Sequence, residues 1–134
     1  MPFTQDVKVL FRHCDPAGIV FYPRYFEMMT DCVEAFFASI DWPFEAMHVT
    51  GAVPTAQIET RFAAPSRHGD HLTLTMWILS VGRTSTGYLM HATCEGEIRF
   101  ETRATLVFVG QDGGATPWPA EIRTKLQEMT EHET

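Results

Sequence analysis

The sequence lacks any uninterrupted apolar run of about 18 residues, the minimum length for a helix that spans a lipid bilayer. Its first residues also lack the basic start and the apolar stretch of a secretory signal peptide. Both absences argue against a membrane partner. We therefore expect a cytoplasmic protein.

Cysteine is scarce and irregularly spaced. The three cysteines, Cys14, Cys32 and Cys94, are odd in number and far apart, and none of them belongs to a CxxC pair. This spacing suggests neither a disulfide framework nor a zinc site.

Basic residues are few and scattered. Ten Lys and Arg oppose 17 Asp and Glu, which gives a formal net charge of −7 at pH 7. A protein with this charge repels phosphate backbones and anionic lipids unless its basic residues cluster, and along this sequence they do not. Nucleic acid and membrane are therefore not expected partners, whereas a small anionic ligand held by one or two arginines remains compatible with the charge.

The chain does have the composition of a globular protein. Hydrophobic residues make up 45% and charged residues 20% of its 134 residues. This length suits one domain with one core, and no linker, repeat or low-complexity segment divides it. We expect a single domain over residues 1–134.

The periodicity predicts one long amphipathic helix over residues 23–40. Pro23 suits the first turn of a helix, where its missing N–H costs nothing. Apolar side chains then recur at spacings of three and four, and acidic residues occupy the other side. The apolar stripe consists of Phe26, Met29, Val33, Phe36, Phe37 and Ile40. A strand over 7–11 precedes this helix, and a helical turn over 44–48 follows it.

Four later segments have the residue types of β-strands, rich in Val, Ile, Thr and aromatics between turn residues. They cover residues 53–62, 72–81, 88–95 and 98–109. Their short connections favour consecutive antiparallel hairpins. We therefore predict an α+β fold in which a five-stranded antiparallel sheet is wrapped around one long helix, with a short C-terminal helix that Pro119 begins and a frayed polar tail over 130–134. One sheet face stays uncovered, so we expect a homo-oligomer.

The segment from residue 11 to residue 26 combines a carboxylate, a tight turn and a helix start. Unpaired N–H groups and the partial positive charge at a helix N-terminus stabilise the oxyanion that forms when a thioester carbonyl is attacked. Asp15 is the candidate nucleophile, or the general base acting through a water. Pro23 has no N–H, so the N–H of Tyr22, or those of Arg24 and Tyr25, are the candidate donors.

Alternatives remain open at these positions. Asp15 could be an Asp-Pro turn residue that only caps the loop, and Gly18 serves either reading because it lets the backbone approach a ligand. His13 and Cys14 flank the carboxylate, but neighbours on an extended segment point to opposite sides, so they do not act as a pair. Thr30 either bonds back to a carbonyl of the previous turn or faces the ligand.

One short loop carries three potential metal ligands, His68, Asp70 and His71. No fourth ligand stands at a recognised spacing, which favours a polar turn over a metal site. We predict no metal.

Two strings resemble a known family. Residues 15–23, DPAGIVFYP, closely resemble the signature of the 4-hydroxybenzoyl-CoA thioesterase family, and residues 62–72 are similar to the turn between the second and third strands of its hot-dog fold. The resemblance covers about residues 5–110. It implies a sheet wrapped around a helix, and a homodimer or homotetramer with active sites at subunit interfaces.

The resemblance also implies roles for individual residues. The family's catalytic aspartate falls on Asp15 and its backbone donor on Tyr22. Apart from the resemblance, the positions of Gly18, Tyr25 and Thr30 in the loop and along the helix make them the expected substrate contacts. Related short-chain acyl-CoA thioesterases carry a histidine near the position of Tyr22, so the tyrosine favours chemistry by the aspartate alone.

The connection over residues 82–87 is not a P-loop, because it has neither the spacing nor the lysine. It is either a flexible hairpin or a contact to the phosphates of coenzyme A. The expected contacts are Arg83, Thr84 and Ser85. Coenzyme A would enter as part of the substrate, and no separate cofactor is predicted.

The predicted function is that of an acyl-CoA thioesterase, for example one acting on an aryl-CoA such as a hydroxybenzoyl-CoA. One alternative is a short-chain acyl-CoA or acyl-carrier-protein thioesterase, although a net charge of −7 would repel an acidic carrier. Another is a module that binds acyl thioesters without turnover, against which the presence of Asp15 counts.

Overall fold

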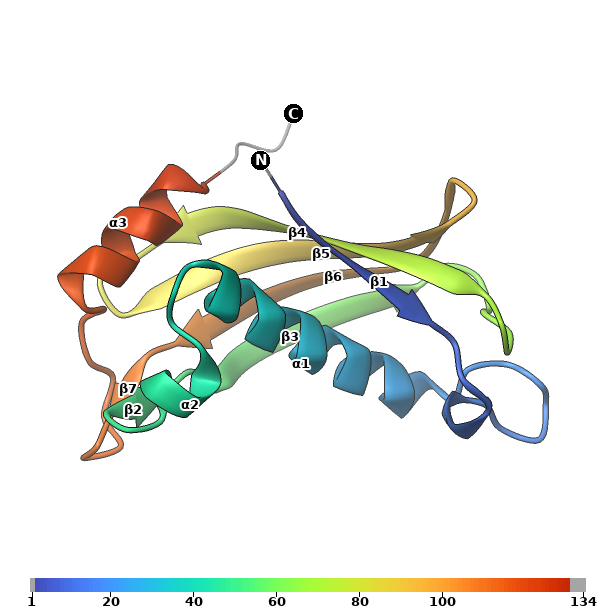
Figure 1. The fold of residues 1–134 in the computed structure, drawn as a ribbon, viewed down its shortest axis with the longest axis horizontal. Helices are drawn as coiled ribbons and strands as arrows, with labels where there is room; N and C mark the ends of the chain where they lie inside the picture. Colours follow the sequence, from blue (N-terminus) through green and yellow to red (C-terminus); the bar gives the residue numbers. More distant parts are fainter. Residues whose placement is uncertain (1, 131–134) are drawn as a thin grey trace.

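The computed structural model describes residues 2–130. The predicted fraying over 130–134 is wrong for Thr130, which bridges to Ile78 and donates its hydroxyl to the Leu126 carbonyl at 3.0 Å, and residues 131–134 lie outside the described part. Figure 1 shows the arrangement of the elements. In chain order they are β1 (Phe3–Lys8), the 3₁₀ turn η1 (Phe11–His13), α1 (Tyr22–Ser39), α2 (Phe44–Met47), β2 (Gly51–Ala52), β3 (Thr55–Phe62), β4 (His71–Val81), β5 (Ser85–Cys94), β6 (Glu97–Val107), β7 (Val109–Gly110) and α3 (Ala120–Glu128).

The long helix α1 lies along the concave face of a five-stranded antiparallel sheet (Figure 1). The strand order is β1-β4-β5-β6-β3. The predicted α+β fold with a short C-terminal helix is confirmed, and α1 begins and ends within one residue of the predicted 23–40.

The core lies between α1 and the three central strands. The buried side of α1 is wider than the predicted stripe, because Tyr25, Met28 and Cys32 are buried as well. A sheet that curves around a helix contacts more than one of its faces, which explains the additional burial. Alternate residues of β4 face this core, as the two-residue period of a strand requires.

The first strand differs from the prediction. It covers Phe3–Lys8 rather than 7–11, and it pairs with β4. The chain leaves the sheet at Val9, whose N–H donates to the Asp70 carbonyl at 2.8 Å. Residues 11–13 then close into η1, so the alternating pattern of Val7, Val9 and Phe11 did not locate the strand end.

The prediction of consecutive hairpins is correct for β4–β5 and β5–β6 but wrong for β3. That strand pairs with β6, where Ile58 lies opposite Ala104, and β1 takes the place beside β4. Seven of the eight β3 residues are exposed, whereas alternate β4 residues are buried. A strand with so little surface to bury belongs at a sheet edge, and the connection over residues 63–70 must therefore cross the end of the sheet.

An aromatic cluster closes the opposite end of the core, where α1 finishes. The rings of Phe37 and Trp42 lie 6.1 Å apart, and Trp118 stacks on Phe108 at 5.6 Å. The β4–β5 hairpin is attached here, because the Trp118 indole N–H donates to the Ser85 carbonyl at 3.0 Å. Within residues 2–130, the helices do not meet the length and hydropathy that crossing a membrane requires.

Candidate active site

Asp15 sits in a tight turn between β1 and α1. Its N–H donates to the Ile19 carbonyl at 3.0 Å, and its own carbonyl accepts from Gly18 N–H at 2.9 Å. Gly18 has φ +81°, a left-handed conformation that glycine adopts without a steric penalty. The Oδ1 atom of Asp15 accepts the Ala17 N–H at 2.9 Å. Within residues 2–130 the structure shows no hydrogen bond to Oδ2, so Asp15 caps the turn with one oxygen and keeps the other available.

His13 fixes the two ends of this loop. Its Nδ1 accepts the Leu10 N–H at 2.8 Å, and its carbonyl accepts the Phe21 N–H at 2.9 Å. The side chain is buried, with 4% of its surface exposed. Burial lowers the pKa of His13, an effect that Arg12 reinforces. The imidazole is therefore neutral, with Nδ1 as the acceptor, and it holds the loop that carries Asp15.

The N-terminus of α1 follows directly after this loop. Its N-cap residue, Phe21, forms no side-chain cap, and the first turn contains no acidic residue. Pro23 cannot donate, and within the described residues the Tyr22 N–H donates to no acceptor. A helix start with an unpaired N–H and no compensating acid attracts negative charge. The structure thus retains Tyr22 as a backbone donor beside the loop of Asp15.

Aromatic side chains from α1 converge on Phe62 at the end of β3. The Phe62 ring lies 5.9 Å from Tyr22, 5.8 Å from Tyr25 in a stacked arrangement, and 6.2 Å from Phe26. Phe62 remains 44% exposed. An aromatic residue at the end of a mostly polar, exposed strand is the signal that could have identified it, and the sequence analysis missed it.

A cavity of about 460 Å³ opens between the start of α1 and the end of β3; we call it the first cavity. Its lining is apolar and aromatic, without a charged side chain, and consists of Ile19, Val20, Tyr22, Tyr25, Phe62, Ala63, Ala64 and Pro65. Burial raises the pKa of the Tyr25 hydroxyl, an effect that Ser66 partly offsets. The phenol is therefore neutral, and the first cavity suits an uncharged, flat group.

The connection over residues 63–70 is bound to the sheet and to the loop. Arg99 donates to Asp70 Oδ2 at 2.8 Å, and the Ser66 carbonyl accepts the Val20 N–H at 2.8 Å. The Arg67 N–H and Arg99 together lower the pKa of Asp70. Asp70 is thus engaged within a polar turn.

Among residues 2–130 no group of three His, Cys, Asp or Glu side chains is arranged to hold a metal ion.

Thr30 lies about two turns after Tyr22, the first residue of α1. Its hydroxyl donates to the Phe26 carbonyl at 3.0 Å, the bond to the previous turn that was one of the two alternatives. Thr30 also lines a second cavity, of about 370 Å³, between α1 and β3. It is therefore separate from the group formed by Asp15, Gly18, Tyr22 and Tyr25.

The connection between β4 and β5 lies at the opposite end of the molecule from the loop between β1 and α1 (Figure 1). It carries Arg83 and Thr84, and Ser85 begins β5. The Arg83 carbonyl accepts the Trp118 N–H at 3.1 Å, which attaches the hairpin near the C-terminal end of α1. A helix of 18 residues separates the two ends by about 27 Å. One chain therefore does not bring the hairpin and the Asp15 loop together.

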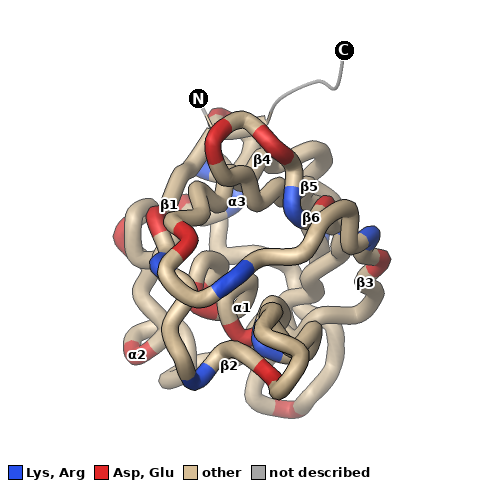
Figure 2. Tube along the Cα trace, turned by 90° about the vertical axis from the view of Figure 1, so that its right-hand side faces the viewer, with Lys and Arg blue, Asp and Glu red and all other residues tan. Residues whose placement is uncertain are grey.

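Charges at the loop end are mixed. Figure 2 looks at this end, and its Lys and Arg positions are separated by acidic and uncharged segments.

The comparisons with known proteins concern the family and the fold. Residues 9–126 match the model of a family described as the thioesterase-like superfamily. No curated protein sequence matches the chain.

Several solved structures share the fold. A 1,4-dihydroxy-2-naphthoyl-CoA thioesterase from Synechocystis has 17% identity and a TM-score of 0.88, over 96% of this chain and 98% of that chain. The gentisyl-coenzyme A thioesterase BH1999 has 24% identity and a TM-score of 0.84, over 90% and 99%. An aspartate-to-asparagine mutant of 4-hydroxybenzoyl-CoA thioesterase, complexed with 4-hydroxybenzoyl-CoA, has 23% identity and a TM-score of 0.85, over 93% and 97%. At these identities the likeness establishes the fold.

Proposed function

We propose that Asp15 carries the reaction of this chain, which belongs to the thioesterase-like superfamily and is a thioester hydrolase with the hot-dog fold, as the sequence resemblance indicated. The proposed reaction is the hydrolysis of an acyl-CoA thioester to the free acid and CoA. The observation that carries the proposal is the position of Asp15. Its carboxylate lies in a turn whose backbone is held at both ends and which leads into an uncapped helix N-terminus. Ile19 and Val20, at the end of the same loop, line the first cavity.

Two routes use this carboxylate. In the first, Oδ2 attacks the thioester carbonyl carbon, the resulting oxyanion accepts the Tyr22 N–H, and the thiolate of CoA departs. Water then cleaves the acyl-aspartyl anhydride and releases the acid. In the second, Asp15 removes a proton from a water that attacks the same carbon. Both routes need an ionised Asp15 with one free oxygen, which the bond from Ala17 to Oδ1 leaves available.

The walls of the first cavity support an aryl acyl group. Tyr22, Tyr25 and Phe62 present aromatic surfaces, and no charged side chain lines the cavity. Aromatic rings pack favourably against such walls in offset or edge-to-face geometry. The acyl group is therefore proposed to be aromatic, in agreement with the resemblance to 4-hydroxybenzoyl-CoA thioesterases.

The separation of the hairpin from Asp15 supports a dimer. β3 is an exposed edge strand, and edge strands readily pair with another chain. A two-fold dimer in which two β3 strands pair antiparallel runs the two α1 helices in opposite directions. It would bring the hairpin of one protomer towards the Asp15 loop of the other, where Arg83 would contact the CoA phosphates.

The function is tested by measuring CoA release from benzoyl-CoA, 4-hydroxybenzoyl-CoA, acetyl-CoA, butyryl-CoA and octanoyl-CoA. We expect turnover, with kcat/KM highest for the aryl thioesters because the aromatic walls bind a flat ring. Absence of turnover with every thioester would contradict the proposed enzyme and favour the alternative of a non-catalytic binding module. A preference for acetyl-CoA or butyryl-CoA would retain the enzyme but reject the aryl substrate.

The dimer is tested by mixing two impaired chains, one altered at the carboxylate and the other at the expected phosphate contact. In a heterodimer of Asp15→Asn and Arg83→Ala, one site would combine the intact Asp15 of one chain with the intact Arg83 of the other. We expect this heterodimer to recover about half the native kcat with the native KM, whereas each homodimer is impaired. Mixed chains whose KM stays at the Arg83→Ala value would show that the hairpin does not act across an interface.

A further inference from the structure

The second cavity lies beside the first one, further along the same side of α1. Its volume is about 370 Å³, it is partly open to solvent, and residues of α1, α2 and the strands β3, β5 and β6 line it. Its lining residues are mostly apolar and are Phe26, Met29, Thr30, Val33, Phe44, Val53, Pro54, Thr55, Ile58, Tyr88 and Leu106. The proposed reaction takes place at the Asp15 loop, and the proposed aryl group binds in the first cavity, so the second cavity has no role in the proposed function.

The polar atoms of this second cavity offer little to a charged ligand. The Thr30 hydroxyl is already bonded to the Phe26 carbonyl at 3.0 Å. Tyr88 is buried, and burial raises the pKa of its hydroxyl to about 12, so the phenol is neutral. Thr55 adds another neutral hydroxyl, and the other walls, such as Met29 and Ile58, are hydrocarbon or thioether. An uncharged hydrocarbon chain is the group that this surface would bind.

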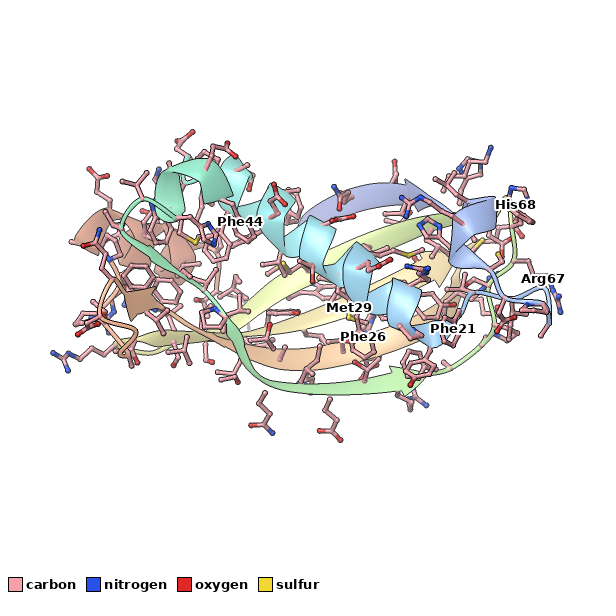
Figure 3. All side chains as sticks on the ribbon, turned by 90° about the horizontal axis from the view of Figure 1, so that it is seen from below. Phe21, Phe26, Met29, Phe44, Arg67 and His68 are labelled. Carbon is pink, nitrogen blue, oxygen red and sulfur yellow. The ribbon has the colours of Figure 1, made fainter. Side chains whose placement is uncertain are left out.

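Two phenylalanine rings stand at the boundary between the cavities. Phe26 lines the second cavity, and Phe62 lines the first. Their ring centroids lie 6.2 Å apart with an interplanar angle of 82°, so the edge of one ring meets the face of the other. Figure 3 shows Phe26 and Met29 on the side of α1 towards β3, between Phe21 at the helix start and Phe44 beyond its end.

We propose that Phe26 determines the acyl specificity of this enzyme, because its ring packs on Phe62 and closes the first cavity against the second. The native enzyme would then accept acyl groups that end within the first cavity, such as aryl groups. Long alkyl chains would be excluded although a hydrocarbon-lined cavity lies directly behind the rings. This inference rests on the proposed thioesterase function of Asp15.

The test compares kcat/KM for benzoyl-CoA and dodecanoyl-CoA in the native protein, Phe26→Ala and Phe62→Ala. Either substitution removes one side of the partition and joins the cavities. We expect kcat/KM for dodecanoyl-CoA, divided by kcat/KM for benzoyl-CoA, to rise by about tenfold or more in both variants. An effect of this size is typical of hydrophobic pocket contacts. The matched control is Phe11→Ala, because that ring is 79% exposed and lines neither cavity. Its ratio is expected to stay at the native value.

Folding does not obscure the result. Phe62 is 44% exposed, so Phe62→Ala is expected to fold even if Phe26→Ala does not. An unchanged ratio in a folded Phe62→Ala variant would overturn the partition while leaving the proposed function intact. A native enzyme that already cleaves dodecanoyl-CoA as well as benzoyl-CoA would also overturn it. Absence of turnover with every thioester would instead overturn the proposed function, and this inference with it.

Discussion

Asp15→Asn is expected to lower kcat for the best thioester substrate by about 10³ or more, since the amide is neither a nucleophile nor a base. The substitution separates the chemical role of Asp15 from its capping role, because asparagine keeps an oxygen at Oδ1. That oxygen can still accept the Ala17 N–H, which Asp15 accepts at 2.9 Å, so the turn is expected to survive. KM should change little, because the carboxylate contributes to the reaction rather than to binding of the acyl or CoA groups.

The measurement is a steady-state assay of CoA release, with circular dichroism and thermal unfolding to show that the variant is folded. Asp31→Asn is the matched control, because Asp31 is an exposed carboxylate further along α1. It undergoes the same chemical change and is expected to keep the native kcat. A folded Asp15→Asn variant with kcat within tenfold of the native value would remove Asp15 from the reaction and reduce it to the capping role that its Oδ1 bond shows.

The second large effect is expected at His13, which is buried and holds the loop through Leu10 and Phe21. His13→Ala removes the Nδ1 acceptor of the Leu10 N–H and leaves space in a buried site. We expect kcat to fall by about 10², the size of effect that a displacement of about 1 Å in a catalytic group can cause. His13→Asn places an amide oxygen near the position of Nδ1, so it should retain most of the activity. Equal losses in the two variants would show that the hydrogen bond to Leu10 does not position Asp15.

The lowered pKa of His13 also leads to an expected dependence of the free energy of unfolding on pH. Its pKa lies below the ordinary 6.5, mainly because of burial; Arg12 and Arg24 lower it, whereas Glu27 and Asp31 raise it. As the pH falls through about 6.5, the unfolded chain binds a proton that the folded chain does not, and unfolding becomes more favourable. The stabilising contribution of the neutral imidazole is therefore complete above about pH 6.5 and is lost as the pH falls towards the folded pKa.

Denaturant unfolding between pH 5 and pH 8 measures this dependence. We expect the free energy of unfolding of the native protein to decrease below pH 6.5 more steeply than that of His13→Asn, which has no proton to bind at this site. Parallel curves for the two proteins would show that other groups, and not His13, cause the loss of stability in acid.

Local sequence patterns determined the parts of the structure that depend on near neighbours. The spacing of apolar residues located α1 to within one residue, because a helix is stabilised by contacts three and four positions apart. The motif over residues 15–23 likewise placed a carboxylate, a tight turn and a helix start within one short segment. The hydrogen bonds of Asp15 to Ala17, Gly18 and Ile19 are all local, which is why this part of the candidate site could be predicted.

Tertiary structure alone decided which distant segments meet. β3 and β4 are neighbours in sequence with a short connection, yet the exposure of β3 places it at the far edge, beside β6. That placement brings Phe62 onto Tyr22 and Tyr25, and it creates both cavities between α1 and β3. The same packing holds Arg83 at the other end of the molecule from Asp15. The strand order depends on how much apolar surface the whole chain buries. That total involves every element of the core, so no local pattern of residues contains it.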